Sequence, residues 1–284
     1  MPELPEVEVV TRSLKKTIKN RKIIKIIVNN RNLRFKLSKN FEHILKNKVI
    51  KNIERKSKYI VFYFGNHLYA ILHLGMSGTL HIPSKKNITN LSFYSNPTLP
   101  KKHNHIIIEF DKIKLIYNDP RRFGYFKILN NKYDFNNYFT RIGPEALDKG
   151  FNWFYLKNKI KNRKKNIKNF LLDQKIVSGI GNIYANEILY KSQVSPMKSV
   201  RKLSKIELIK IIEFSKITLK DAIKYGGSSI KDFKSLSGGG GSFQTKFTVY
   251  NRENLKCTKS KCKGIIKKRY ISNRSTFVCN FCQT

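Results

Sequence analysis

Four cysteines lie close together near the end of this 284-residue chain, and their spacing is that of a metal site. Cys257 and Cys262 are separated by four residues, and Cys279 and Cys282 by two. Two such turns can direct four thiolates at one point, where zinc binds tetrahedrally. Because disulfides are disfavoured in reducing compartments, we expect one structural Zn²⁺ per chain, with disulfides or free thiols as the alternative.

The chain begins MPELPE, and removal of Met1 would leave Pro2 with a free secondary amine. A terminal amine has a pKa of about 8, against about 10.4 for lysine, so more of it is neutral and nucleophilic at neutral pH. Such an amine can add to a sugar carbon and form an iminium ion, and Glu3 beside it can transfer protons. From these residues alone the simpler interpretation is structural, with prolines that start a helix and acids that face its positive end.

The charge balance indicates a polyanionic partner. The chain has 58 Lys and Arg against 18 Asp and Glu, which gives a formal net charge of +40. Part of this excess reflects a composition rich in Ile, Asn and Lys, but solubility alone needs far less. No apolar run approaches the roughly 20 residues that cross a bilayer, and no signal peptide precedes the acidic start. We therefore expect a cytoplasmic protein with no membrane partner.

The elements that must position these groups are of two kinds. Apolar residues at three- and four-residue steps predict a helix from Pro5 to about Ile18. Short runs rich in Ile, Tyr and Phe between residues 22 and 129 predict an antiparallel β-sandwich or barrel. The stretch 83–102 has little pattern and is expected to form a long exposed loop.

Helical periods dominate from residue 151. They predict four or more helices, the last with Ser204 as N-cap and Glu207 at the capping-box position. Six glycines between residues 226 and 241 predict a mobile loop, and a short β-rich tail holds the cysteines. We expect an α+β multidomain fold with these parts: a β-sandwich domain with an N-terminal helix at 1–132, a linker at 133–150, a helical domain at 151–246 and a zinc-finger β-hairpin at 247–284.

Motifs along the whole chain, in order, resemble those of the bacterial formamidopyrimidine-DNA glycosylase (8-oxoguanine DNA glycosylase/AP lyase) family. They are MPELPEVE, SKYIVF, HLGMSGTL, NDPRRFGYF, GPEAL, LLDQKIVSGIGNIYANEILY, GGSSIKDF and the four-cysteine tail. The resemblance implies a base excision repair enzyme that excises oxidised purines from duplex DNA and cuts the strand by β- and δ-elimination. It also implies a catalytic N-terminal domain, a helix-two-turn-helix motif, a nucleoid-associated monomer and no small-molecule cofactor.

The resemblance assigns catalytic roles to four residues and a structural role to a fifth. Pro2 would form a Schiff base with the sugar, and Glu3 would donate a proton to it. Lys58 would serve the glycosylase step by contacting a phosphate, although without the resemblance a solvated lysine before a strand is the simpler interpretation. Arg274 would contact phosphate and assist the last elimination, and Glu6 resembles the structural acid near the site.

The resemblance also assigns DNA contacts. Met76, Arg121 and Phe123 match three residues that enter the duplex when the damaged nucleotide is rotated out, a movement that costs a few kcal/mol. Four further matches lie elsewhere: the backbone contacts His103 and Arg163, Lys168 near the damaged site, and the phosphate-binding Asn182. The alternative for Asn182 is an ordinary helix N-cap.

Two departures and two competing functions stay open. The four-residue spacing between Cys257 and Cys262 is longer than the family's usual two, and the loop after Gly226 is unusually rich in glycine. The related endonuclease VIII group prefers oxidised pyrimidines, but it usually has glycine where this chain has Leu4. A catalytically silent, zinc-stabilised nucleic-acid binder is the second alternative, and its affinity would depend steeply on salt.

Overall fold

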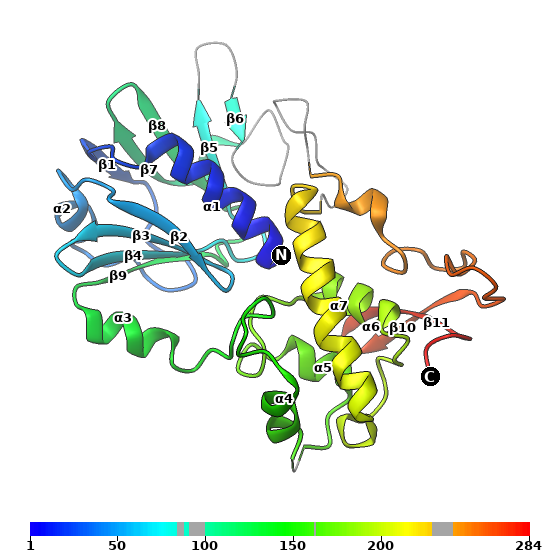
Figure 1. The fold of residues 1–284 in the computed structure, drawn as a ribbon. Coiled ribbons are helices and arrows are strands. Elements are labelled where there is room, and N and C mark those ends of the chain that lie inside the picture. The colour runs from blue at the N-terminus through cyan, green and yellow to red at the C-terminus, as the bar shows by residue number, and fades with distance from the viewer. Residues whose placement is uncertain (84–87, 91–99, 162, 229–240) are drawn as a thin grey trace. The chain divides into compact units, whose positions relative to one another are not determined.

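The computed structural model describes residues 1–83, 88–90, 100–161, 163–228 and 241–284, which form two compact units (Figure 1). Unit 1 contains Met1–Thr140 and Tyr225–Gln244, and unit 2 contains Arg141–Lys224 and Thr245–Thr284. The second segment of unit 1, Tyr225–Gln244, contains the glycine-rich stretch. The four-part division predicted from the sequence, with boundaries at 132, 150 and 246, remains a prediction.

Unit 1 is built from two antiparallel sheets, as predicted. The first has the strand order β1-β7-β8-β5-β6, with β1 (Lys25–Val28), β5 (Thr79–Pro83), β6 (Ile88–Asn90), β7 (Asn104–Phe110) and β8 (Ile113–Asn118). The second has the order β2-β3-β4-β9, with β2 (Asn52–Lys56), β3 (Tyr59–Gly65), β4 (Leu68–His73) and β9 (Tyr125–Leu129). Buried residues from both sheets and from α1 (Leu4–Ile18) form one hydrophobic core.

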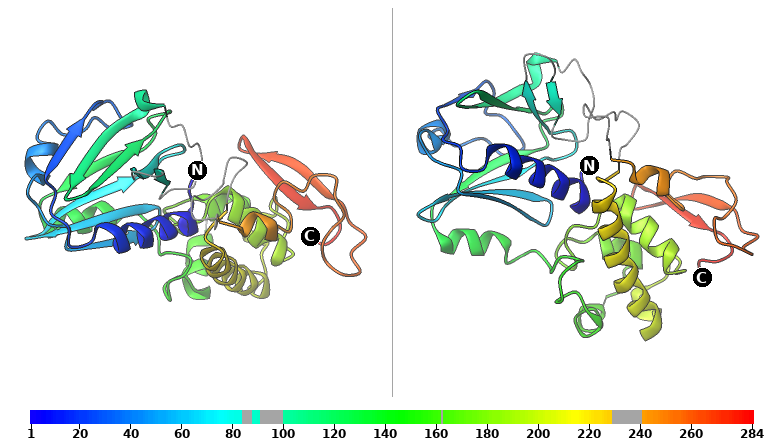
Figure 2. Two further views of the ribbon diagram at one scale, coloured as in Figure 1. Left: turned by 90° about the horizontal axis from the view of Figure 1, so that it is seen from above. Right: turned by 45° about the horizontal axis from the view of Figure 1, so that its top comes forward.

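Helix α1 brings the N-terminal residues to the edge of this core. Val7, Val10 and Leu14 are buried at helical spacing, and burial of each stabilises the unit by about 1.5–3 kcal/mol. Glu3 is the N-cap, and its backbone N–H donates to the Glu6 carboxylate at 2.9 Å in a capping box. The helix lies beside β2 and β3, so its first turn is held by the second sheet (Figure 2).

The sequence interpretation missed three elements and misjudged a fourth. Strand β2 has a single fully buried residue, Ile53, and α2 (Phe41–Leu45) is only five residues long. Helix α3 (Lys132–Phe139) replaces most of the first half of the expected linker, because its aromatic side chains pack on rings of the second sheet. Strand β6 lies within the expected loop 83–102, so the loop prediction was wrong for residues 88–90. Residues 84–87 and 91–99 of this loop lie outside the described residues, and so do residues 229–240 of the predicted glycine-rich loop.

Unit 2 is mainly helical. Its helices are α4 (Trp153–Ile160), α5 (Ile167–Leu172), α6 (Asn182–Lys191) and α7 (Lys205–Lys224), with a short turn of 3-10 helix at Val200–Lys202 between α6 and α7. A second 3-10 turn, Phe243–Lys246, lies where the chain passes from unit 1 into unit 2. The capping box predicted for the last helix is confirmed: Glu207 N donates to Ser204 Oγ at 3.2 Å, and Ser204 N donates to the Glu207 carboxylate at 2.8 Å. Across the parts of the chain that the structure describes, no helix has the length and apolar character needed to span a membrane.

A β-hairpin ends unit 2 and packs against α6. Its strands are β10 (Ile266–Ile271) and β11 (Arg274–Cys279), joined by a two-residue turn at Ser272 and Asn273. Both turn residues have positive φ, as the tightest hairpin turns require. The fully buried Glu187 of α6 accepts hydrogen bonds from the N–H groups of Thr248 (2.9 Å), Val249 (3.0 Å) and Tyr250 (2.8 Å), and so fixes the segment that leads into the hairpin.

Two buried histidines make the stability of unit 1 dependent on pH. Burial lowers the pKa of His81 to about 4, and burial together with the nearby cations Lys58 and Arg34 lowers that of His73 to about 4. The unfolded chain takes up these protons near pH 6.5 and the folded unit only near pH 4. The free energy of unfolding should therefore fall as pH drops from 6.5 towards 4, by about 3 kcal/mol for each histidine.

Thermal unfolding between pH 7.5 and 4.5 tests this expectation. His81→Gln should remove about half of the fall, whereas the exposed His43 gives a control, His43→Gln, that should leave the fall unchanged. A melting temperature that stays level between pH 6.5 and 4.5 would contradict this account of the two histidines.

Candidate active site and nucleic-acid interface

The start of α1 gathers five of the predicted site residues in unit 1. Burial lowers the pKa of the Met1 terminal amine below its usual value of 8.0. The carboxylates of Glu3 and Glu6 oppose this shift. The cations of Lys58 and Arg121 add to it. Pro2 is buried between the terminal amine and the helix, so the charged groups predicted to surround a terminal nucleophile are within interaction range of the chain's N-terminus.

Glu6 ties the N-terminus to the segment that follows α7. Its carboxylate is 4% exposed and accepts hydrogen bonds from Glu3 N at 2.9 Å, Ser228 N at 2.8 Å and Ser228 Oγ at 2.9 Å. Gly226 and Gly227, just before Ser228, have φ values of +75° and +83°, which favour glycine. Glu6 therefore fixes both the first turn of α1 and the beginning of the glycine-rich segment.

Lys58 is buried, with 5% of its surface exposed, so it is not the solvated lysine of the alternative interpretation. It follows a turn at Ser57, which has a positive φ of 57°. Arg55 fixes this turn, because it donates to Ser57 O at 3.0 Å and to the Glu8 carboxylate of α1 at 2.7 Å. The ammonium group is thus held beside the N-terminus by two elements of the same unit.

His73 lies opposite Tyr59, the residue after Lys58, in the β3–β4 pairing. Gly75 N donates to His73 Nδ1 at 3.0 Å, so the remaining proton of the neutral ring is on Nε2. The low pKa keeps this ring neutral at physiological pH. The Lys58 cation is close enough to His73 to lower its pKa, so these two side chains are neighbours in unit 1.

Two turns carry Met76, Arg121 and Phe123, the three residues predicted to enter the duplex. Met76 is 40% exposed and Phe123 38%, and the Arg121 guanidinium lies 4.6 Å from the centre of the Phe123 ring. A Cβ on Gly75 would lie 2.4 Å from Gly124 N, so glycine is needed where the two turns touch. These side chains therefore belong to one exposed feature made of two tightly packed turns.

Asp119 connects the turns. It is fully buried and accepts hydrogen bonds from the Ser77 hydroxyl of one turn and from Gly124 N of the other, the second at 2.8 Å. Its own N–H donates to His103 O at 3.1 Å, which places the predicted backbone contact His103 beside the same feature.

In unit 2, Lys168 and Asn182 hold the hairpin. Lys168 is fully buried, and its Nζ donates to Ser275 O at 2.9 Å and to Thr276 Oγ1 at 2.7 Å. Asn182 Nδ2 donates to Ser275 O at 3.0 Å. The N-cap of α6 is Gly181, so the N-cap interpretation of Asn182 was wrong. Two predicted DNA contacts therefore share the backbone of β11 as a hydrogen-bond partner.

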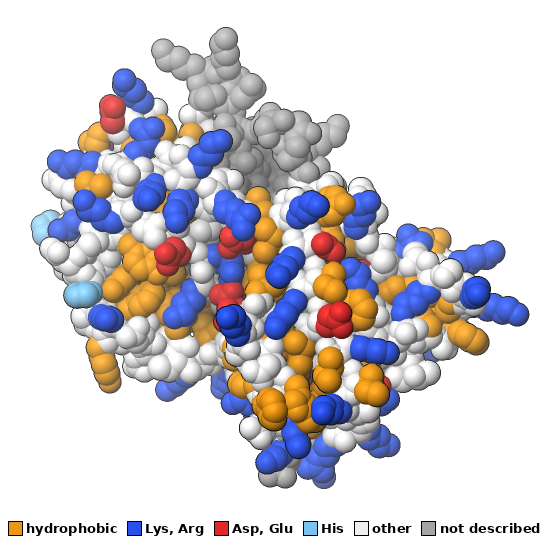
Figure 3. Space-filling model, viewed as in Figure 1, with side chains coloured by type: hydrophobic (Ala, Val, Ile, Leu, Met, Phe, Trp, Pro, Cys, Tyr) orange, Lys and Arg blue, Asp and Glu red, His pale blue; other side chains and the backbone are white. Residues whose placement is uncertain are grey.

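Arg274 and Arg163 lie on the more accessible parts of unit 2. Arg274 is the first residue of β11 and is exposed next to the hairpin turn. Arg163 lies between α4 and α5 among further cations, and its backbone N–H donates to Ile160 O at 3.0 Å. On the face drawn in Figure 3, Lys and Arg side chains are spread over both units, in keeping with the +40 net charge.

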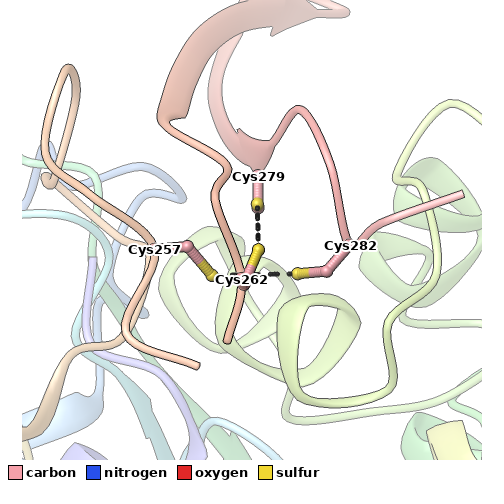
Figure 4. A group of neighbouring side chains, drawn as sticks. All are labelled: Cys257, Cys262, Cys279 and Cys282. Atoms are coloured by element: carbon pink, nitrogen blue, oxygen red, sulfur yellow. Dashed lines mark hydrogen bonds between the residues drawn. The ribbon is translucent and has the colours of Figure 1, made fainter. Parts of the chain in front are cut away.

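The four cysteines form the predicted cluster (Figure 4). Their sulfur atoms all lie within 4.8 Å of one another, with Cys257 and Cys282 3.8 Å apart and Cys262 and Cys279 3.7 Å apart. A tetrahedral site with zinc–sulfur bonds of about 2.3 Å has edges of about 3.8 Å, whereas a disulfide is about 2.05 Å long. The four cysteines therefore fit a tetrahedral metal ion. They are free cysteines, so the disulfide alternative is wrong, and thiols without a metal stay as the other alternative.

Two protein-family models match this chain. The model of the formamidopyrimidine-DNA glycosylase N-terminal domain matches residues 1–126, and the model of the formamidopyrimidine-DNA glycosylase H2TH domain matches residues 142–234. The chain belongs to the formamidopyrimidine-DNA glycosylase family. It is therefore an enzyme, a DNA glycosylase of base excision repair.

Relatives and solved structures agree over the full length. The formamidopyrimidine-DNA glycosylase of Wolbachia pipientis subsp. Culex pipiens (strain wPip) is 42% identical, and that of Dinoroseobacter shibae is 36% identical, each over 100% of both chains. Among solved structures, a Lactococcus lactis Fpg variant in complex with Fapy-dG containing DNA has a TM-score of 0.88 and 32% identity over 100% of both chains. The Lactococcus lactis Fpg complex with an abasic site containing DNA gives the same values over 99%.

The glycosylase fold is thus confirmed, and the roles of its individual residues remain predictions. Sequence reasoning missed His73 and Asp119, although both lie in motifs that were recognised. His73 had a signal in the sequence, because it is a histidine at the end of a strand and two residues before a glycine. Asp119 had none, because its role depends on Ser77, which is distant in the sequence.

Glu6 gives a testable expectation for this glycosylase. In Glu6→Gln the side chain keeps its size, but an NH₂ group replaces one of the two acceptor oxygens. This group cannot accept the hydrogen bond that Glu3 N or Ser228 N donates to the carboxylate. An unsatisfied buried donor costs about 1–3 kcal/mol, so the rate of strand cleavage should fall about 10- to 100-fold. Single-turnover cleavage of lesion-containing duplex measures this rate.

Glu109→Gln is the matched control. Glu109 lies in β7 of the same unit and pairs with Lys114, away from the N-terminus and Lys58. It should lower the melting temperature slightly and leave cleavage within about threefold of the unchanged protein. Equal cleavage by Glu6→Gln and the unchanged protein would show that Glu6 does not organise the site.

Proposed function

We propose that this glycosylase is bifunctional: it excises oxidised purines such as 8-oxoguanine and formamidopyrimidines, and it cuts the DNA strand through an imine on Pro2. The observation that carries the proposal is the position of the N-terminus: the charged groups of Glu3, Glu6 and Lys58 lie close enough to act on the terminal amine of Met1, one residue before Pro2. The abasic-site and Fapy-dG complexes of the Lactococcus lactis neighbours support a damaged duplex as the substrate.

The chemistry begins after Met1 is removed. The Pro2 nitrogen forms a bond to C1′ of the damaged nucleotide, and the glycosidic bond breaks with its electron pair passing to the purine. The nitrogen loses its proton, Glu3 protonates O4′, and the sugar ring opens to an iminium ion. Loss of a C2′ proton expels the 3′ phosphate, a second elimination expels the 5′ phosphate, and water releases the sugar fragment from Pro2.

The remaining residues serve binding. Met76, Arg121 and Phe123 fill the space left by the rotated nucleotide, which offsets the cost of unstacking. Lys58 serves the glycosylase step by contacting a phosphate, and the buried Lys168 holds the hairpin near the damaged site. His73, His103, Arg163 and Asn182 contact or organise the phosphate backbone. Their effect should weaken with salt, because phosphate contacts release counterions.

The metal ion of the cysteine cluster is proposed to be Zn²⁺. Cys257, Cys262, Cys279 and Cys282 would hold it, and bound zinc would supply folding energy to the hairpin. The hairpin in turn presents Arg274 at its turn, where the side chain can contact the phosphate that leaves in the second elimination.

Product analysis tests the proposal. A duplex with 8-oxoguanine opposite cytosine should give a one-nucleotide gap with phosphate at both ends, the signature of β,δ-elimination. A duplex with thymine glycol should be cut far more slowly, and the reverse preference would favour the endonuclease VIII group. Binding without cleavage of either duplex would favour the silent nucleic-acid binder.

A further inference from the structure

The metal cluster has a neighbour that the proposed function does not use. Tyr190, near the end of α6, is buried with 2% of its surface exposed. Its hydroxyl oxygen lies 3.0 Å from Cys257 Sγ and 2.9 Å from Thr258 Oγ1. Lys259 Nζ lies 5.3 Å from the centre of the same ring, so the turn after Cys257 is folded over this tyrosine.

The direction of the first hydrogen bond follows from the chemistry of a metal site. A cysteine bound to a metal is a thiolate and carries no proton, so the Tyr190 O–H must donate to Cys257 Sγ. The Thr258 hydroxyl can then donate to the tyrosine oxygen. Such hydrogen bonds from outside the ligand set orient the ligands and adjust the charge on them.

The second pair of cysteines is fixed from the same end of α6 by a different residue. Cys279 N donates to Gln283 Oε1 at 2.9 Å, and Gln283 Nε2 donates to Val194 O at 3.0 Å. Gln283 is buried as well. The segment 190–194 therefore reaches both turns of the cluster, through Tyr190 on one side and Gln283 on the other.

We propose that Tyr190 is a positioning residue of the metal site, which holds Cys257 and its four-residue turn in the geometry for metal binding. Four residues between the first two ligands leave more conformational freedom than the two residues between Cys279 and Cys282. The hydroxyl restrains this freedom and stabilises the thiolate, so it slows loss of the metal. The inference rests on the proposed metal site and is independent of glycosylase activity.

Metal release from the full chain tests the inference. Protein loaded with one Zn²⁺ is mixed with excess chelator, and release is followed with a zinc-binding dye. Tyr190→Phe should release zinc about 10-fold faster, within the 10- to 100-fold range typical of such partners. The matched control is Tyr155→Phe, which removes a 2.7 Å hydrogen bond to Ile176 O in the same unit and should release zinc at the unchanged rate.

A spectroscopic readout separates positioning from general loss of stability. In Co²⁺-substituted protein, the sulfur-to-cobalt charge-transfer bands should shift to lower energy in Tyr190→Phe, because the thiolate loses a hydrogen bond, and should not shift in Tyr155→Phe. If Tyr190→Phe fails to fold, the exposed Thr258 offers Thr258→Val, which should give a smaller increase in release rate.

The outcomes are distinguishable from failure of the proposed function. Equal release rates and equal spectra for Tyr190→Phe and the unchanged protein would overturn the inference while leaving the metal site intact. An unchanged chain that binds neither Zn²⁺ nor Co²⁺ would overturn both the inference and the proposed metal site. Cleavage of lesion DNA is tested separately and affects neither conclusion.

Discussion

Protein that keeps any residue before Pro2 should lose strand cleavage at a lesion by a factor on the order of a thousand or more. An added residue converts the terminal amine into an amide, which has no nucleophilic lone pair, and removal of a catalytic nucleophile costs enzymes several orders of magnitude. Single-turnover cleavage by protein with a removable N-terminal tag gives this factor, with the same preparation after tag removal as the reference.

Two controls make the result specific. Binding to a duplex with a reduced abasic site should change little on tagging, because the phosphate contacts come from other residues. Pro2→Gly should keep part of the cleavage rate, since its terminal primary amine can also form an imine. Full cleavage by tagged protein of verified mass would contradict the role of Pro2.

Cys279→Ser should abolish binding of the proposed zinc ion and unfold the hairpin. Cys279 is fully buried at the end of β11, and structural zinc contributes about 10–16 kcal/mol to the folding of small zinc domains. We expect loss of zinc, loss of hairpin protection in amide hydrogen exchange, and at least about 100-fold weaker cleavage as Arg274 loses its support. Metal analysis and cleavage assays of the purified variant measure these effects.

The exposed Ser260 lies in the turn between the first two cysteines and provides the control Ser260→Ala. This variant should keep one zinc per chain and cleave normally. Full cleavage by metal-free Cys279→Ser would show that the cluster does not support the DNA-cutting function.

Local patterns made much of this fold predictable. The helix at Leu4–Ile18 repeats apolar residues at helical steps, and the longest helix begins with a capping box between Ser204 and Glu207. Strand β2 was missed because a single side chain, that of Ile53, is fully buried. Helix α3 was missed because its packing uses aromatic rings such as Phe135 and Phe139 among polar residues, which resembles a linker.

The site was predictable as a set of residue types, but its geometry was not. The cysteine spacing is local and indicated the cluster directly. The burial of Lys168 depends on Thr276, more than a hundred positions away, and the hydrogen bonds of Glu6 depend on Ser228. Such pairings arise only when distant segments meet, so a sequence pattern cannot indicate them.

Borohydride trapping with mapping of the crosslink tests the central claim most directly. The unchanged protein is mixed with 8-oxoguanine duplex and borohydride, the trapped complex is digested, and the modified peptide is sequenced by mass spectrometry. The account predicts that a reduced sugar adduct lies on the nitrogen of Pro2, at the first position of the N-terminal peptide. An adduct on a lysine such as Lys58, or cleavage of the strand with no trapped adduct at all, would contradict it.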